Sequence, residues 1–131
     1  MANDIVISSE NAVSLAEQFK SEDLIKPLQK EIFLFDTFVA GTMHIEDESI
    51  IKELKSGEKL SLRREPKNRF DENAVRVDDE KGRKLGYVPE KDNYVFARLM
   101  DAGKMLIGRV TDIKAKTGYT QVSMAIYLID F

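Results

Sequence analysis

A stretch in the middle of the chain carries side chains that can hold anions and stack on flat rings. Residues 62–77 read LRREPKNRFDENAVRV. Their arginines and lysine suit phosphate oxygens, and an aromatic ring such as Phe70 gains about 1–3 kcal/mol for each base stacked on it. Asp71 follows directly, and its carboxylate can accept a charge-assisted hydrogen bond from a hydroxyl. These residue types suit a ligand that has a flat ring, a hydroxyl and phosphates.

The same stretch predicts an ordered loop between two strands. Pro66 cannot take part in a central strand ladder, and Asn68, Asp71 and Asn73 favour bonds from side chain to local backbone. Loops of this kind commonly carry binding sites. An aromatic at the tip of a polar loop has two interpretations: Phe70 either stacks on a ligand or folds back into the domain as a plug.

The other polar side chains of the loop also have two interpretations each. Asp71 either accepts from a ligand hydroxyl or closes an Asx turn on the Asn73 amide. Asn68 either contacts a base or sugar or closes the loop. The cationic candidates for phosphate contacts include one, Arg64, that could instead pair with Glu65 or another carboxylate; the full set is Arg63, Arg64, Lys67 and Arg69.

The segments around this loop predict a mainly β domain with inserted helices. Residues 46–55 and 89–103 have apolar residues at helical spacing, and each segment is followed by or ends at a glycine. Strand patterns recur along the rest, and the last two flank a Lys116-Thr117-Gly118 turn. We therefore predict a small, partly open OB-like or SH3-like β-barrel of about six strands. The predicted strands are 32–43, 59–64, 74–77, 85–88, 106–114 and 121–129.

The N-terminal part of the chain has a different character. Residues 9–20 place apolar side chains at helical spacing behind a Ser9 cap, and Pro27 interrupts a second short helical stretch. This predicts a helical extension over residues 1–31 and a barrel domain over residues 32–131. The extension either packs on the barrel or docks on a partner.

Composition excludes several classes of site and protein. The 131 residues contain no cysteine and one histidine, His44, so disulfides, thiolate metal sites and a histidine zinc cluster are excluded and no cofactor is expected. A signal peptide and a long apolar span are not recognisable, which predicts a cytoplasmic protein without membrane contact. Asp78, Asp79 and Glu80 form a polar turn; we expect solvated carboxylates there, with a magnesium site as the alternative.

Charge further restricts how the chain could contact nucleic acid. The net charge is −3 and the pI is about 5.3, which argues against coating nucleic acid through a broadly basic surface. Only residues 52–76 are clearly positive, with eight basic and five acidic side chains. Any such site must therefore be local, and a mixed-charge solvated surface is the alternative for this window.

The order of residues in the loop resembles the central motif of HIRAN domains. That motif runs R-x-P-x-N-x-aromatic-D-x-N-A-[IV]-x-V, and the chain has it from Arg64 to Val77. Residues 38–41 upstream, Gly86-Tyr87-Val88-Pro89 downstream and a helix that ends near Gly103 complete the resemblance, which covers about residues 33–128.

The resemblance implies a binding module that captures the 3′-hydroxyl end of single-stranded DNA. In that family the motif aromatic, here Phe70, sandwiches the terminal base with an aromatic of the first strand, here Phe38. Asp71 would accept from the 3′-hydroxyl and would reject a 3′-phosphate. The full set of expected DNA-binding residues is Phe38, Arg64, Lys67, Asn68, Phe70, Asp71 and Lys91.

Three positions depart from the family pattern. Thr37 stands where better-studied members have an arginine, and Val39 replaces a second aromatic. Glu90 stands where a lysine reaches a phosphate, so Lys91 would have to act from one residue further along.

The expected function is therefore single-stranded DNA binding in repair or processing, with a repair or helicase protein as a partner and without catalysis. Recognisable nucleotide-binding or nucleophile motifs are missing from the sequence. The alternative is a protein-interaction module that binds a peptide in an aromatic groove of the barrel. The tyrosines that could line that groove are Tyr87, Tyr94, Tyr119 and Tyr127.

Overall fold

The computed structural model describes residues 29–45 and 47–130. Residues Glu31–Asp130 form one compact unit. The helix expected over residues 9–20, and almost all of the extension expected over residues 1–31, lie outside the described residues. The division of the chain at residue 31 stays a prediction.

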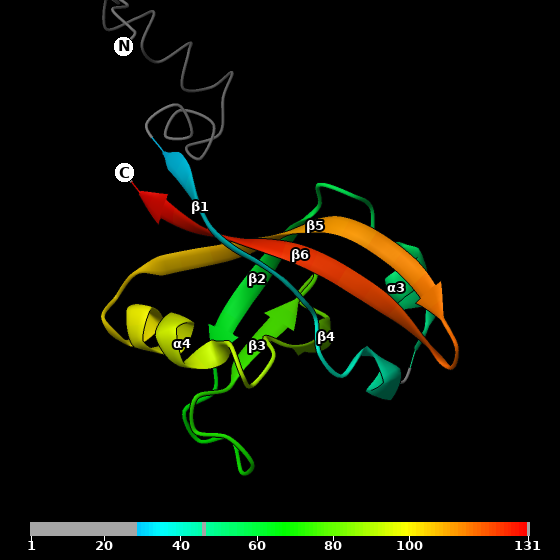
Figure 1. The fold of residues 1–131 in the computed structure, drawn as a ribbon, viewed down its shortest axis with the longest axis horizontal. Coiled ribbons are helices and arrows are strands. Elements are labelled where there is room, and N and C mark those ends of the chain that lie inside the picture. Colours follow the sequence, from blue (N-terminus) through cyan, green and yellow to red (C-terminus); the bar gives the residue numbers. More distant parts are fainter. Residues whose placement is uncertain (1–28, 46, 131) are drawn as a thin grey trace, which may run out of the picture. The chain divides into compact units, whose positions relative to one another are not determined.

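Six strands form one sheet in the order β1-β6-β5-β2-β3-β4, and the registered pairs are all antiparallel. β5 and β6 make a long curved hairpin around a two-residue turn (Figure 1). The predicted fold class, a mainly β domain with inserted helices and about six strands, is confirmed. The strands are β1 Lys30–Phe38, β2 Lys59–Arg64, β3 Val75–Asp78, β4 Lys84–Tyr87, β5 Met105–Lys116 and β6 Tyr119–Asp130.

The two edges of the sheet meet at one point. Directly after β1, the Ala40 amide donates to the Tyr87 carbonyl at 2.7 Å, and the Tyr87 amide donates back to Ala40 at 3.0 Å. Gly86 makes this approach possible, because a Cβ at this position would lie 2.1 Å from the Ala40 carbonyl oxygen. The sheet is thereby bent into a partly open barrel.

Alternating side chains of the strands fill the interior of this barrel. Leu60, Val75, Val77 and Leu85 are fully buried from three successive strands, as the period-two pattern requires. Helix α4, Asn93–Asp101, adds Phe96 and Ala97 to the same core. Among the described residues, no helix is long and apolar enough to cross a bilayer.

Two helices are shorter than the sequence patterns predicted. In place of a helix over 46–55, a 3-10 turn, η2 Thr42–His44, precedes a single helical turn, α3 Ser49–Lys52. Ile51 and Leu54 still face the core, but the Leu54 amide donates to the Ile51 carbonyl in an i to i+3 turn that ends the helix.

The second helix begins later than the Pro89 start that we expected. The Asp92 amide donates to the Pro89 carbonyl at 2.9 Å, so residues 89–92 form a turn, and α4 starts at Asn93. This turn places the Asn93 side chain in the interior, where it is 2% exposed.

The expectation that Asp78 and Asp79 are solvated is wrong. Their residues are 1% and 2% exposed. Asp78 accepts from Arg76 Nε at 2.6 Å, and Asp79 accepts from Arg83 Nε at 2.7 Å. The nearby arginines offset part of the cost of burying each carboxylate, although among the described residues Asp78 Oδ2 has no hydrogen-bond partner. Within residues 29–45 and 47–130, no cluster of three acidic or histidine side chains could hold a metal ion.

Candidate nucleic-acid interface

The loop between β2 and β3 is ordered by its own side chains. Asn68 Oδ1 accepts from the amides of Phe70 and Asp71 at 2.9 and 3.1 Å, and Asn68 Nδ2 donates to Glu65 Oε1 at 3.1 Å. The Glu65 amide donates to the Ala74 carbonyl at 3.0 Å and closes the base of the loop. Asn68 therefore has the loop-closing role of the two that the sequence left open, and a contact of Asn68 with DNA stays a prediction.

Phe70 extends from this ordered loop into solvent. Its ring is 93% exposed, so the alternative in which Phe70 folds back as a plug is wrong. Asn68 fixes the Phe70 backbone, which limits the entropy lost when a base stacks on the ring. The structure thus presents an aromatic surface without a partner among the described residues.

Asp71 lies beside Phe70 and already accepts two hydrogen bonds. Oδ1 accepts from the Asn73 amide at 2.8 Å, which is the predicted Asx turn, and Oδ2 accepts from Asn93 Nδ2 at 2.6 Å. A carboxylate offers about four lone-pair sites, so two acceptor positions remain. The turn and a bond to a ligand hydroxyl are therefore compatible.

A cleft of about 400 Å³ opens between this loop, β4 and the start of α4. We call it the terminal cleft. The predicted residues Asn68, Phe70 and Asp71 line it together with Lys84, Tyr87, Glu90 and Asn93. Sequence reasoning missed Lys84 and Asn93 as parts of the site. A polar residue at the start of an apolar helix was the available signal for Asn93, whereas only the strand pairing identifies Lys84.

Glu65 connects the loop to the wall of the terminal cleft. Its Oε1 accepts from the Tyr87 hydroxyl at 2.8 Å as well as from Asn68. Partial burial acts to raise the pKa of Glu65, but these two hydrogen bonds, with Lys84 and Arg76 nearby, hold that pKa below its ordinary value. The ionised carboxylate therefore fixes the Tyr87 ring beside the loop.

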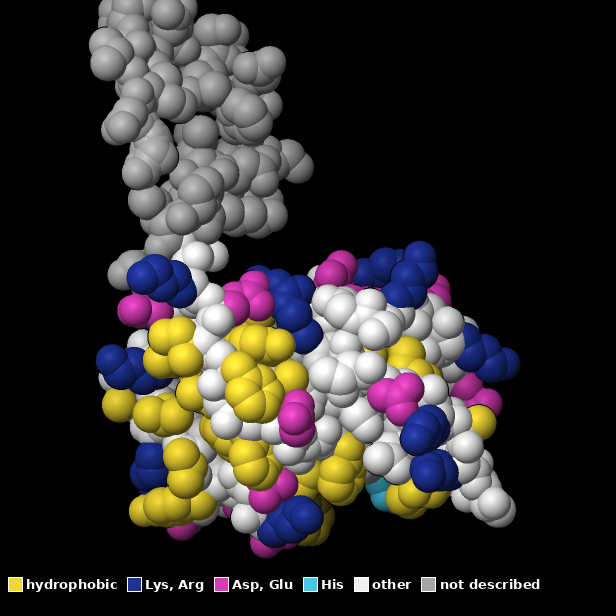
Figure 2. All heavy atoms as spheres, turned by 45° about the horizontal axis from the view of Figure 1, so that its top comes forward, with side chains coloured by type: hydrophobic (Ala, Val, Ile, Leu, Met, Phe, Trp, Pro, Cys, Tyr) yellow, Lys and Arg dark blue, Asp and Glu magenta, His cyan; other side chains and the backbone are white. Residues whose placement is uncertain are grey.

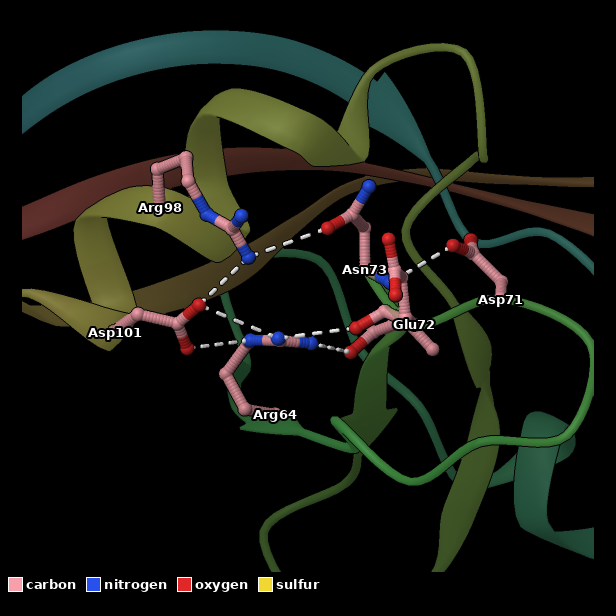
Figure 3. Close-up of polar contacts among 7 residues, drawn as sticks. Arg64, Asp71, Glu72, Asn73, Arg98 and Asp101 are labelled. Carbon is pink, nitrogen blue, oxygen red and sulfur yellow. Dashed lines mark hydrogen bonds and ion pairs between the residues drawn. The ribbon is translucent and has the colours of Figure 1, made fainter.

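Arg64 is bound within the protein (Figure 3). Its guanidinium donates to both carboxylate oxygens of Asp101, at 2.8 and 3.3 Å, and to the carbonyls of Ala74 and Glu72, at 2.8 and 3.1 Å. The side chain is only 12% exposed. Pairing with a neighbouring carboxylate, one of its two predicted roles, is what the structure has; a phosphate contact by Arg64 stays a prediction.

The remaining predicted residues do not line the terminal cleft. Phe38 is 37% exposed and lines a different hollow, with Met43 and Tyr119. The structure therefore does not bring Phe38 and Phe70 together around one cleft, and their sandwich stays a prediction. Lys67 and Lys91 are exposed, while Glu90, rather than Lys91, lines the cleft.

The face drawn in Figure 2 is not broadly basic, and the four tyrosines do not line one common groove. On the face drawn in Figure 2, Lys and Arg side chains alternate with Asp and Glu. The four tyrosines of the peptide alternative have separate surroundings: Tyr87 lines the terminal cleft, Tyr119 the hollow of Phe38, Tyr127 packs on Phe33, and Tyr94 lies under Arg98.

The family follows from a direct match to the sequence. The model of the HIRAN domain matches residues 32–129, most of the chain. The chain belongs to the HIRAN domain family. The resemblance stated from the central motif is thereby confirmed, and the match spans the whole described sheet except the first two residues of β1 and the last residue of β6. No curated protein sequence matches this HIRAN chain closely enough to be reported as a relative.

Solved structures with the same fold include the following. A protein from Lactobacillus plantarum has 27% identity and a TM-score of 0.73, over 79% of this chain and 99% of that chain. The crystal structure of the HIRAN domain of human HLTF has 18% identity and a TM-score of 0.62, over 77% and 78%. The HLTF HIRAN domain in its DNA-bound conformation has 20% identity and a TM-score of 0.53, over 75% and 79%.

Proposed function

We propose that this chain is a binding module for single-stranded DNA and that it captures a free 3′-hydroxyl end in the terminal cleft. The observation that carries the proposal is the 93% exposed ring of Phe70 on an ordered loop at the edge of that cleft. Membership of the HIRAN family and the DNA-bound state of the HLTF HIRAN domain support DNA as the ligand.

The side chains of the terminal cleft suit a 3′-terminal nucleotide. Phe70 stacks on its base, and the remaining acceptor positions of Asp71 take the 3′-hydroxyl proton. Lys67 is exposed on the same loop and supplies a phosphate contact. A terminal phosphate would face the carboxylates of Asp71 and Glu90, so the same cleft disfavours it.

The setting of this binding is part of the proposal. Free 3′ ends are exposed when DNA is repaired or processed, so we propose that setting, with a repair or helicase protein as partner. Binding, rather than catalysis, is the activity that the terminal cleft supports. The cytoplasmic location expected from the sequence stays a prediction.

Truncation of Phe70 tests the proposal. We expect Phe70→Ala to weaken binding of a labelled 3′-hydroxyl oligonucleotide by about 5- to 150-fold, equal to about 1–3 kcal/mol of lost stacking. Fluorescence anisotropy measures this, and circular dichroism confirms that the variant is folded.

Phe33→Ala is the matched control, because this ring is also exposed, at 53%, and packs on Tyr127 away from the loop. Equal affinity of the Phe70→Ala variant and the wild type would contradict the proposal. Binding that weakens little with added salt would instead favour the peptide-binding alternative, since phosphate contacts release counterions.

A further inference from the structure

A second cleft of about 440 Å³ lies directly beside the terminal cleft. Its walls come from residues 41–45, which include η2, from residues 47–50, and from β4. Two side chains of β4, Lys84 and Tyr87, line both clefts. The two clefts are therefore neighbours across this one pair of side chains.

The pair between the clefts combines a cation with a fixed aromatic ring. Lys84 Nζ lies 4.5 Å from the centre of the Tyr87 ring, and the Tyr87 hydroxyl is held by Glu65 at 2.8 Å. Lys84 is exposed, and its charge helps to lower the pKa of Glu65, but among the residues that the structure describes it forms no ion pair with a carboxylate. An exposed cation above a fixed ring leaves its charge available to an anion that passes between the clefts.

The second cleft has the surface that a nucleobase needs. Ile45 and Ile50, which are both partly exposed, give it apolar walls, and Gly41 leaves part of the backbone uncovered. At its rim, the carboxylate of Asp47 accepts from the Ser49 amide at 3.0 Å, and the hydrogen bonding with Ser49 lowers the Asp47 pKa. An ionised carboxylate there can accept a hydrogen bond from an N–H group on a base edge, while the apolar walls cover the base faces.

We propose that the second cleft holds the nucleotide that precedes the 3′-terminal one, with Lys84 on the phosphate that joins the two. The proposal rests on the function proposed above. It extends the contact from one nucleotide to two and assigns the strand a direction, from the second cleft over Lys84 into the terminal cleft.

Removing one charge from the protein and one from the DNA tests this arrangement. The probe is a 3′-hydroxyl decamer in which the phosphate between the last two nucleotides is replaced by an uncharged methylphosphonate. We expect the wild type to bind this probe about three- to fivefold more weakly than the natural decamer. Lys84→Ala should bind both decamers equally, and its affinity should fall less steeply with salt, by about 0.7 in logarithmic slope.

Two controls make the result specific. Lys81→Ala removes an exposed lysine of the β3–β4 turn that lines neither cleft, and this variant should keep the sensitivity to the methylphosphonate. A methylphosphonate placed six nucleotides from the 3′ end should affect wild type and Lys84→Ala alike. An abasic site at the second position from the 3′ end should weaken wild-type binding, because it removes the base from the second cleft.

The outcomes separate the two proposals. If Lys84→Ala discriminates between the natural and the modified decamer as strongly as the wild type does, the second cleft is not the path of the strand, although DNA binding stands. Lack of effect of the abasic site would overturn base binding in that cleft. Failure of the wild type to bind any single strand would overturn the proposed function and this inference with it.

Discussion

Phe70 and Asp71 stand on a loop whose own side chains hold it in place. Asn68 binds the amides of both residues, and Asp71 binds the Asn73 amide and the Asn93 side chain. A site formed in this way loses little entropy when a ligand binds, because its backbone is already ordered. Turn geometry, which the structure has, and the proposed ligand contact are therefore compatible uses of the same side chains.

At the same scale, Glu65 should make the loop sensitive to acid. Its pKa is lowered in the folded protein, so the stability it contributes is present above its unfolded value of about 4.5 and is lost as the pH falls through the folded value. We expect Glu65→Gln to reduce the free energy of unfolding by about 1 kcal/mol at pH 7. Thermal denaturation should show this difference shrinking toward pH 3.

Glu72→Gln is the control for that measurement. It removes the same charge from the same loop, but the Glu72 side chain is exposed and only its backbone carbonyl accepts a hydrogen bond, from Arg64. Its melting temperature should stay close to that of the wild type at both pH values. A constant difference between Glu65→Gln and the wild type from pH 7 to pH 3 would contradict the role given to the ionised carboxylate.

Among the described glycines, Gly86 at the junction between β4 and the segment after β1 has the least room for a side chain. In a Gly86→Ala variant the new methyl would lie 2.1 Å from the Ala40 carbonyl oxygen and 2.9 Å from Val39 Cγ1. The strands must separate to admit it, so we expect a loss of about 3 kcal/mol or more in the free energy of unfolding. Urea denaturation measures this loss.

Gly82→Asn serves as the control for Gly86→Ala. Gly82 has a positive φ of 81° in the β3–β4 turn, and a Cβ there meets nothing within 4 Å. Asparagine adopts this conformation more readily than most residues, so its loss should be clearly smaller. Similar losses of unfolding free energy in the two variants would contradict the conclusion that the close backbone approach at Gly86 excludes a side chain.

Arg64 shows how one element holds another in place. It ends β2, and it connects the carbonyls at the end of the loop, from Glu72 and Ala74, to Asp101 at the end of α4. Arg98 donates to the same carboxylate at 2.7 Å and to Asn73 at 3.2 Å. The α4 helix thus holds the end of the loop through Asp101 and Arg98.

For the whole molecule, local patterns predicted the strands better than the site. Period-two alternation located β2 at its exact bounds, because alternate residues face one core, and the predicted bounds of β3 to β6 lie within two residues of those observed. The first strand, predicted over residues 32–43, is wrong at its end: β1 stops at Phe38, and the 3-10 turn η2 takes up Thr42–His44. The short helices were overestimated, since Leu54 meets the core equally well from an i to i+3 turn. The loop motif located Phe70, Asp71 and Asn68 together.

What the sequence could not supply is the set of long-range contacts. The meeting of Ala40 with Tyr87, the bond from Asn93 to Asp71 and the pairing of Arg64 with Asp101 join residues 22–47 positions apart. Charge patterns alone left Arg64 as a phosphate candidate, and only the fold shows that it makes four hydrogen bonds within the protein. Burial of Asp78 and Asp79 was missed for a different reason: their partners Arg76 and Arg83 are only two and four positions away, but the pattern of charges does not show that strand and turn geometry buries these pairs.

Discrimination between two DNA ends tests the central claim most directly. Wild-type protein is titrated, with fluorescence anisotropy as the readout, into one labelled single strand that ends in a 3′-hydroxyl, the same strand with a 3′-phosphate, and a blunt duplex. The account predicts tightest binding to the 3′-hydroxyl strand, because Asp71 accepts from that hydroxyl and repels the phosphate. Equal binding to the two single strands, or no binding to either at low salt, would contradict it.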